Sequence, residues 1–169
     1  MATPIVHSAS YPAPVERVHA AFASEQYWDD RIEQIGGPAG RIDAFTDAEG
    51  TVTVQMVQTV AEENLPSLIT KIRHGDLEIH RTQIWGPLDS SGQRATGSFS
   101  ASIPGTPAHI SGTVTLAASG TGSTLTVDGE VGVRIPLVGK KVEQIAADQL
   151  TRLLNKEDEF TVAWTAAHS

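Results

Sequence analysis

The sequence of 169 residues contains no cysteine, few aromatic side chains and no long apolar run. The absence of cysteine excludes disulfide bonds, a thiolate nucleophile and a cysteine-ligated metal, and it fits a reducing cytoplasm, where we expect the protein to reside. A membrane-spanning helix needs roughly 20 consecutive apolar residues, and residues 1–7 lack the basic and apolar regions of a signal peptide. We therefore expect no stable membrane insertion.

Basic residues are also scarce relative to acidic ones. The chain has 12 Lys and Arg against 20 Asp and Glu, which gives a formal net charge of −8. Such a surface repels phosphate backbones, so we expect no nucleic acid partner. The length is most simply that of a single domain over residues 1–169. The oligomeric state is left open by the sequence.

Helix and strand patterns follow one another in a clear order. A short strand is predicted over residues 6–11, and it is followed by two short helices, one beginning near Pro14 and one after Ser24. From Gly40 onward the apolar residues alternate, which indicates strands. The predicted strands are 41–46, 51–60, 77–85, 94–103, 109–117 and 123–135, with a short helical excursion within 64–72. A long amphipathic helix is predicted over 140–164.

The alternation gives each strand one apolar and one polar face, as in an antiparallel sheet that is covered on one side. Gly97, Gly112 and Gly129 fall on the apolar face and leave room for bending or for a close neighbour. The last helix would be ~38 Å long, enough to cross strands of ~33 Å. The fold class is therefore α+β, a curved antiparallel sheet of about seven strands wrapped around a long C-terminal helix, with a cavity between them.

The segment YPAPVERV at residues 11–18 and the segment VRIPLVGKKVE at residues 133–143 stand at the entry and exit of this arrangement. With the order of elements, they resemble the START-like (SRPBCC) superfamily, which has the helix-grip fold and includes Bet v 1 type and polyketide cyclase/dehydratase-like proteins. Within it, the chain resembles an uncharacterised actinobacterial family over nearly its full length. The resemblance implies binding of a hydrophobic small molecule or lipid between the sheet and the long helix, since most members do this and a minority are enzymes.

Polar side chains on the predicted inward faces are the candidates for recognition. They are Gln58 on strand 51–60, Arg81 and Gln83 on strand 77–85, and Glu157 on the apolar stripe of the long helix. Arg81 could clamp a ligand carboxylate, and Glu157 could orient a hydroxyl group or act as a general base. Alternatively, Arg81 and Glu157 simply pair with each other. Arg81 could also extend past the edge of the sheet to solvent. We favour these two structural roles over ligand recognition, because charged side chains are seldom buried without a partner.

Large apolar side chains on the same faces are the candidates for the wall of the cavity, because pockets are lined mainly by such residues. A ligand's body would contact Leu68, Trp85, Phe99, Leu150, Leu153 and Phe160. Residues 65–72 would gate the opening.

No metal site, cofactor or catalytic motif is predicted. His74, Asp76, Glu78 and His80 alternate along one strand, but residues i and i+2 are ~6.8 Å apart, too far for the quartet to converge on one ion. We interpret them as a polar outer face.

Three functions remain open. The first is a carrier or sensor that binds a hydrophobic molecule. The second is a cyclase or dehydratase-like enzyme that uses Glu157 or Arg81; it ranks lower because the sequence offers no nucleophile and no inward histidine. The third is a protein-interaction domain without a functional pocket.

Overall fold

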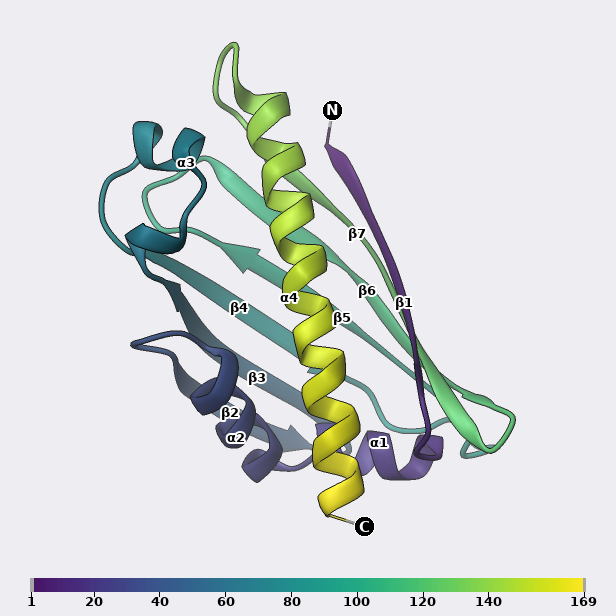
Figure 1. Cartoon of the computed structure of the whole chain (residues 1–169). Helices are drawn as coiled ribbons and strands as arrows, with labels where there is room; N and C mark the ends of the chain where they lie inside the picture. Colours follow the sequence, from purple (N-terminus) through teal and green to yellow (C-terminus); the bar gives the residue numbers. More distant parts are fainter. Residues whose placement is uncertain (1, 169) are drawn as a thin grey trace.

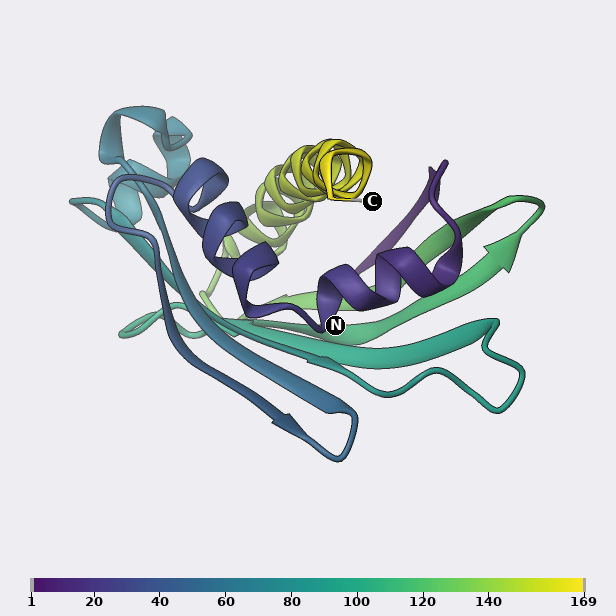
Figure 2. The same cartoon turned by 90° about the horizontal axis from the view of Figure 1, so that it is seen from below.

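The computed structural model describes residues 2–168. Its seven strands form one antiparallel sheet that curves strongly, and the helices α1, α2 and α4 lie on the concave side (Figures 1 and 2). The protein therefore has the helix-grip arrangement, with α4 running diagonally across the sheet.

The elements follow the predicted order. The N-terminal part comprises β1 (Thr3–Tyr11), α1 (Val15–Phe22) and α2 (Glu25–Ile35). The middle comprises β2 (Arg41–Ala48), β3 (Thr51–Val60), the short 3₁₀ helix η1 (Glu62–Asn64), α3 (Ser67–Ile72), β4 (Leu77–Trp85) and β5 (Arg94–Ser102). The last part comprises β6 (Ala108–Ser119), β7 (Gly122–Val133) and α4 (Gly139–Ala167).

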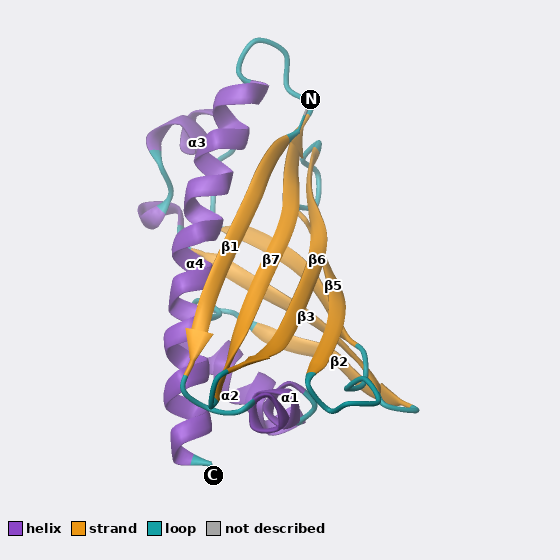
Figure 3. Ribbon diagram, turned by 90° about the vertical axis from the view of Figure 1, so that its right-hand side faces the viewer, coloured by secondary structure: helices purple, strands orange, loops and turns teal. Residues whose placement is uncertain are grey.

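The strand order is β1-β7-β6-β5-β4-β3-β2. From β2 to β7 each strand pairs with its neighbour in sequence, which confirms the predicted meander. The first strand pairs with the last, in a register that places Thr3 opposite Val131 and Tyr11 opposite Ser123. This pairing places β1 at the edge of the sheet, where it runs beside α4 (Figure 3).

Alternation along the strands buries the predicted inward faces. On β3, Val52, Val54, Met56 and Gln58 are all buried. On β4 the buried residues are Arg81, Gln83 and Trp85. On the concave side of the sheet, Phe22 of α1 stacks on Trp85, with 4.9 Å between the ring centroids. Trp28 of α2 lies in the same region and is 1% exposed. This aromatic cluster closes one end of the space between sheet and helix.

Two glycines allow an aromatic ring to lie against the sheet. A Cβ atom at Gly112 would lie 2.8 Å from Cε1 of Phe99, and one at Gly129 would lie 2.9 Å from Cζ of Phe99. Both distances are shorter than a carbon–carbon contact of about 3.5–4.0 Å allows. The inward glycines on β6 and β7 thus leave room for the ring of Phe99, the close neighbour that the sequence pattern indicated.

Helix α4 is anchored near its start by Glu143. One carboxylate oxygen accepts the backbone N–H of Val133 at 2.9 Å, and the other accepts the hydroxyl of Thr3 at 2.8 Å. These hydrogen bonds, first that of Val133, hold the pKa of Glu143 below its usual value. None of the helices within residues 2–168 combines the length and the hydrophobicity that a membrane crossing needs.

Candidate ligand-binding cavity

A cavity of about 820 Å³ lies between the concave face of the sheet and α4. It begins at the aromatic residues Trp28 and Trp85 and extends to Ile72 of α3 and Ile135 before α4. Most of its wall is apolar, and a few polar side chains reach into it from β3, β4, α2 and α4. The volume falls within the range of about 300–1,000 Å³ that is typical of small-molecule sites.

Eight of the ten residues predicted for a binding site line this cavity. They are Gln58, Arg81, Gln83, Trp85, Phe99, Leu150, Leu153 and Glu157. The strand register explains why they converge, because Arg81 lies opposite Met56 on one side and Ala101 on the other, so the polar residues of β3 and β4 share one face.

Two of the predicted residues do not line the cavity. Phe160 is buried against α2, with its ring centroid 5.5 Å from that of Tyr27. It lies almost one helical turn after Glu157, where α4 packs on α2 rather than facing the sheet. Leu68 packs against the apolar cluster of Ile5 and Val131. Its neighbours Ile69 and Ile72 line the cavity instead.

A buried ionic cluster centres on the carboxylate of Glu157. Arg81 Nη1 lies 2.6 Å from Glu157 Oε2, and Arg31 Nη2 lies 2.6 Å from Glu157 Oε1. The same Nη1 of Arg81 donates to Gln58 Oε1 at 2.7 Å. All three charged side chains are less than a tenth exposed. The predicted pairing of Arg81 with Glu157 is confirmed, and both residues also line the cavity.

Both guanidinium groups act on the acidity of Glu157. Burial raises the pKa of this carboxyl group, but the charges and hydrogen bonds of Arg31 and Arg81 outweigh burial and lower it to about 2. Burial alone would lower the pKa of Arg31, yet the nearby carboxylate of Glu157 and the phenol of Tyr27 raise it overall. The cluster therefore contains two positive charges and one negative charge at neutral pH.

Arg31 is the member of the cluster that the sequence analysis missed. It lies on α2 between buried residues, and its guanidinium carbon is 4.7 Å from the centroid of the Trp28 ring, a cation–π contact. The signal that could have found it is the one that identified Glu157, a charged residue within the apolar stripe of a helix. Trp28, Ile32 and Ile35 define that stripe on α2, and Arg31 falls inside it.

A second polar group joins β1 to α4 beside the cavity. Asp158 accepts the hydroxyl of Tyr11 at 2.6 Å, and its other oxygen lies 2.6 Å from Nε2 of His7. Burial, followed by the charge of Asp158, raises the pKa of the Tyr11 hydroxyl. Tyr11 and Asp158 both line the cavity. This group fixes the edge strand against the helix, and sequence periodicity alone did not indicate it.

No group of three or more potential metal ligands lies together within residues 2–168. Glu78 and His80 belong to the stretch of alternating acidic and histidine residues that ends on β4. Nε2 of His80 lies 2.8 Å from Oε1 of Glu78, and both side chains are more than two fifths exposed. These residues form part of an outer surface, as their spacing indicated.

Comparison with known sequences places most of the chain in one family. The sequence model of a family described as "Protein of unknown function (DUF2505)" matches residues 6–165. The uncharacterized protein Rv0481c of Mycobacterium tuberculosis is 34% identical over 165 residues, which cover 93% of each chain. The uncharacterized protein Mb0491c of Mycobacterium bovis matches to the same extent.

Solved structures share the fold at low sequence identity. The protein TTHA0849 from Thermus thermophilus has a TM-score of 0.58 at 16% identity, covering 95% of this chain and 98% of the other. The Bet v 1-like protein Ara h 8.0201 has a TM-score of 0.59 at 10% identity, covering 99% of each chain. These similarities establish the START-like helix-grip fold and say nothing further of function.

Proposed function

The chain belongs to the DUF2505 family of proteins of unknown function, and on this premise we propose that it binds one hydrophobic small molecule in the cavity between the sheet and α4. The observation that carries the proposal is the cavity itself, about 820 Å³ of mostly apolar space with a polar cluster on its wall. Protein interiors are otherwise close-packed, with few voids larger than a water molecule, so the open space favours a small-molecule ligand over a role as a protein-binding module alone.

The apolar part of the wall suits the body of such a molecule. Phe99 lines the cavity from the sheet, where it lies over Gly112 and Gly129, and Leu150 and Leu153 line it from α4. Burying apolar surface contributes about 25 cal/mol per Å², so a molecule that fills this space gains affinity without any specific polar contact. The polar cluster at Glu157 then orients one end of the molecule.

The geometry at Glu157 favours binding over proton transfer. A general base works best when its pKa lies near the working pH, whereas the pKa of Glu157 is lowered to about 2. Both carboxylate oxygens are engaged by guanidinium groups. Glu157 is thus suited to hold Arg31 and Arg81 in place.

The test is native mass spectrometry of the purified protein, followed by organic extraction and identification of retained molecules. Ala146→Phe places a ring in the cavity, because Ala146 lines it on α4. Ala163→Phe is the matched control, since Ala163 is an exposed residue of the same helix. Thermal unfolding of both variants checks that the fold is retained.

We expect a retained or added hydrophobic molecule to bind the wild-type protein at near one-to-one stoichiometry, to be lost from Ala146→Phe and to stay in Ala163→Phe. Equal binding by both variants would place the ligand elsewhere and overturn the proposal. A wild-type protein that binds none of a panel of hydrophobic molecules would overturn it as well.

A further inference from the structure

The wall of the cavity is positively charged in a chain that is negative as a whole. Five of the 12 Lys and Arg residues line it, against two of the 20 carboxylate residues. The carboxylates are Glu157 and Asp158, and the cations are Arg31, Arg73, Arg81, Arg152 and Lys156. The excess of three positive charges contrasts with the net charge of −8 for the chain. Arg152 and Lys156 are exposed, whereas Arg31 and Arg81 are buried in the wall and lie where a ligand would bind.

The innermost cations are not neutralised by the protein. Arg31 and Arg81 share the single carboxylate of Glu157, which leaves one positive charge in excess within a cluster less than a tenth exposed. An uncompensated buried charge is costly unless a partner or water stabilises it. The nearest other acid on the wall, Asp158, is engaged by Tyr11 and His7.

Unpartnered donors mark the same wall. Within residues 2–168, two buried side-chain N–H groups lack an acceptor, and they are Nε of Arg31 and Nε of Arg73. Both arginines line the cavity. Buried donors without an acceptor are rare in folded proteins, so a hydrogen-bond acceptor is expected to reach them from the cavity.

We infer that the ligand is an amphipathic carboxylic acid whose carboxylate binds Arg31 at the Glu157 cluster while its apolar body lies against Phe99 and Leu150. This inference rests on the proposed binding function and names its ligand class. One carboxylate brings the cluster of two guanidinium groups and Glu157 to neutrality. Its two oxygens match the fork of N–H donors on a guanidinium. A phosphate monoester carries a charge of about −1.5 to −2 at neutral pH. This is more than the single positive charge by which Arg31 and Arg81 exceed Glu157.

The test compares ligands that differ only in the head group. Isothermal titration calorimetry of the wild-type protein uses dodecanoic acid against dodecan-1-ol, and pyrenebutyric acid against pyrenebutanol. Dodecyl phosphate distinguishes a phosphate site from a carboxylate site. The carboxylate of each acid can form a hydrogen bond with Arg31 in which both groups are charged, and the alcohol cannot. Such a bond raises affinity about tenfold or more, so each acid should bind at least about tenfold more tightly than its alcohol.

Arg31→Gln removes the excess charge and leaves the neutral pair of Arg81 and Glu157. We expect affinity for the acid to fall by about tenfold or more and affinity for the alcohol to fall less, because the alcohol carries no charge to pair with Arg31. Arg41→Gln is the matched control, because Arg41 is an exposed arginine that pairs with Asp43 at 2.8 Å outside the cavity. Far-UV circular dichroism and the unfolding temperature establish that each variant is folded. If Arg31→Gln does not fold, the comparison of acid with alcohol on the wild-type protein decides the inference alone.

The outcomes separate the two proposals. Alcohols that bind the wild-type protein as tightly as the acids would overturn the carboxylate inference and leave hydrophobic binding intact. So would a dodecyl phosphate that binds more tightly than dodecanoic acid, or an Arg31→Gln variant that loses acid and alcohol equally. If neither acids nor alcohols bind, the proposed function itself fails.

Discussion

Nη2 of Arg31 lies 2.6 Å from Oε1 of Glu157, so helix α2 supplies a second guanidinium to a carboxylate that Arg81 of β4 already binds. One buried carboxylate thus connects two helices with the centre of the sheet. The contact has two consequences. It fixes the position of α4 above the cavity, and it leaves a positive charge on the cavity wall.

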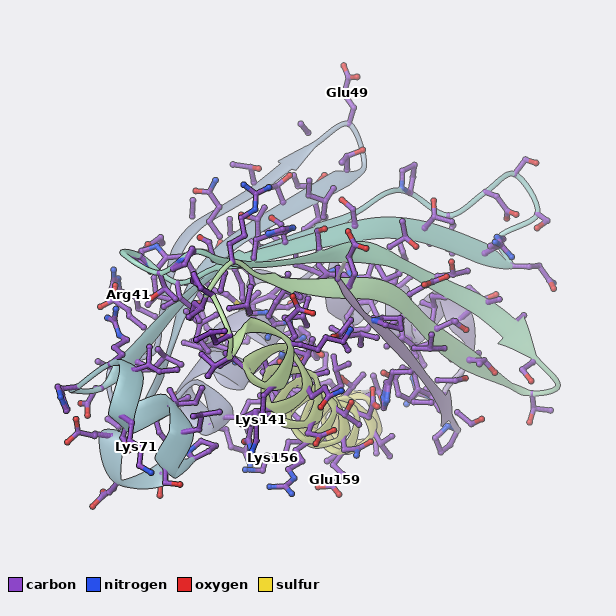
Figure 4. All side chains as sticks on the ribbon, turned by 90° about the horizontal axis from the view of Figure 1, so that it is seen from above. Arg41, Glu49, Lys71, Lys141, Lys156 and Glu159 are labelled. Atoms are coloured by element: carbon purple, nitrogen blue, oxygen red, sulfur yellow. The ribbon has the colours of Figure 1, made fainter. Side chains whose placement is uncertain are left out.

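Removal of the central carboxylate is expected to destabilise the fold strongly. Glu157→Gln leaves Arg31 and Arg81 buried without an anionic partner, and breaking a buried pair in this way costs about 3–5 kcal/mol. Glu159→Gln is the matched control, since Glu159 projects from the outer side of α4 (Figure 4) and is exposed. Its effect should stay within about 0.5 kcal/mol. The measurement is the free energy of unfolding in urea, and similar values for the two variants would contradict the structural role of the cluster.

The same carboxylate predicts a specific loss of stability in acid. The pKa of Glu157 is about 2 in the folded protein against an ordinary value of 4.5. A lowered folded-state pKa contributes stability that is fully present above the ordinary value and is lost as the pH falls toward the folded value. A difference of this size corresponds to about 3 kcal/mol.

The measurement is urea unfolding of the wild-type protein and of Glu157→Gln at a series of pH values from about 7 down to about 2. The stability difference between the two proteins should be constant above about pH 5 and shrink by about 3 kcal/mol toward pH 2. Other acids with a lowered pKa, such as Asp30 and Glu143, are present in both proteins and cancel in the difference. A constant difference over the whole range would show that Glu157 does not titrate in this way.

Much of the fold follows from short-range patterns. Strands 51–60 and 77–85 were predicted with the bounds that β3 and β4 have, because strict alternation and clear turn residues define them. The inward direction of Arg81 follows from the same alternation. These features depend only on neighbours in sequence, so periodicity is sufficient to predict them.

Apart from the pairing of Arg81 with Glu157, features that depend on distant partners were not predicted. The pairing of β1 with β7 joins the first strand to the last, and no local pattern specifies which strand an edge strand meets. Phe160 lies on the apolar stripe of α4, but periodicity does not tell whether a residue of that stripe faces the sheet or α2. The contact between Asp158 and Tyr11 spans almost the whole chain, and it became visible only in the structure.

The close approach of β6 and β7 beneath Phe99 predicts that Gly112 tolerates no side chain. In Gly112→Ala the new Cβ would lie 2.6 Å from Cα of Gly129, which is backbone and cannot move aside, and 2.8 Å from the ring of Phe99. Overpacking of this kind costs about 1–3 kcal/mol. Gly132→Ala is the control on β7, because the three atoms nearest to its Cβ all belong to the ring of His109, an exposed side chain that can rotate away. Urea unfolding should show the larger loss for Gly112→Ala, and equal losses would argue against a packed floor at Phe99.

Helix α3 is expected to be the part of the cavity wall that opens. It has no buried residue, although Ile69 and Ile72 line the cavity. Its C-terminal end is tied down by Arg73, whose Nη1 donates to the backbone carbonyl of Pro104 at 3.2 Å and to the hydroxyl of Thr106 at 3.5 Å. Segments with few buried contacts open locally at low free energy. The structure therefore supports, as a prediction, the gate that the sequence analysis placed at residues 65–72.

Hydrogen–deuterium exchange monitored by mass spectrometry tests this prediction. Amides of α3 should exchange faster than those of β3 and β4, and saturation with a bound hydrophobic molecule should slow them. Arg73→Gln removes hydrogen bonds that contribute about 1 kcal/mol each, so exchange in α3 should rise by roughly tenfold while exchange in α1 stays unchanged. Arg94→Gln is the control, an exposed arginine at the start of β5 that does not line the cavity. If α3 exchanges as slowly as β4, and Arg73→Gln leaves it so, then α3 is a fixed part of the wall and ligands enter by another route.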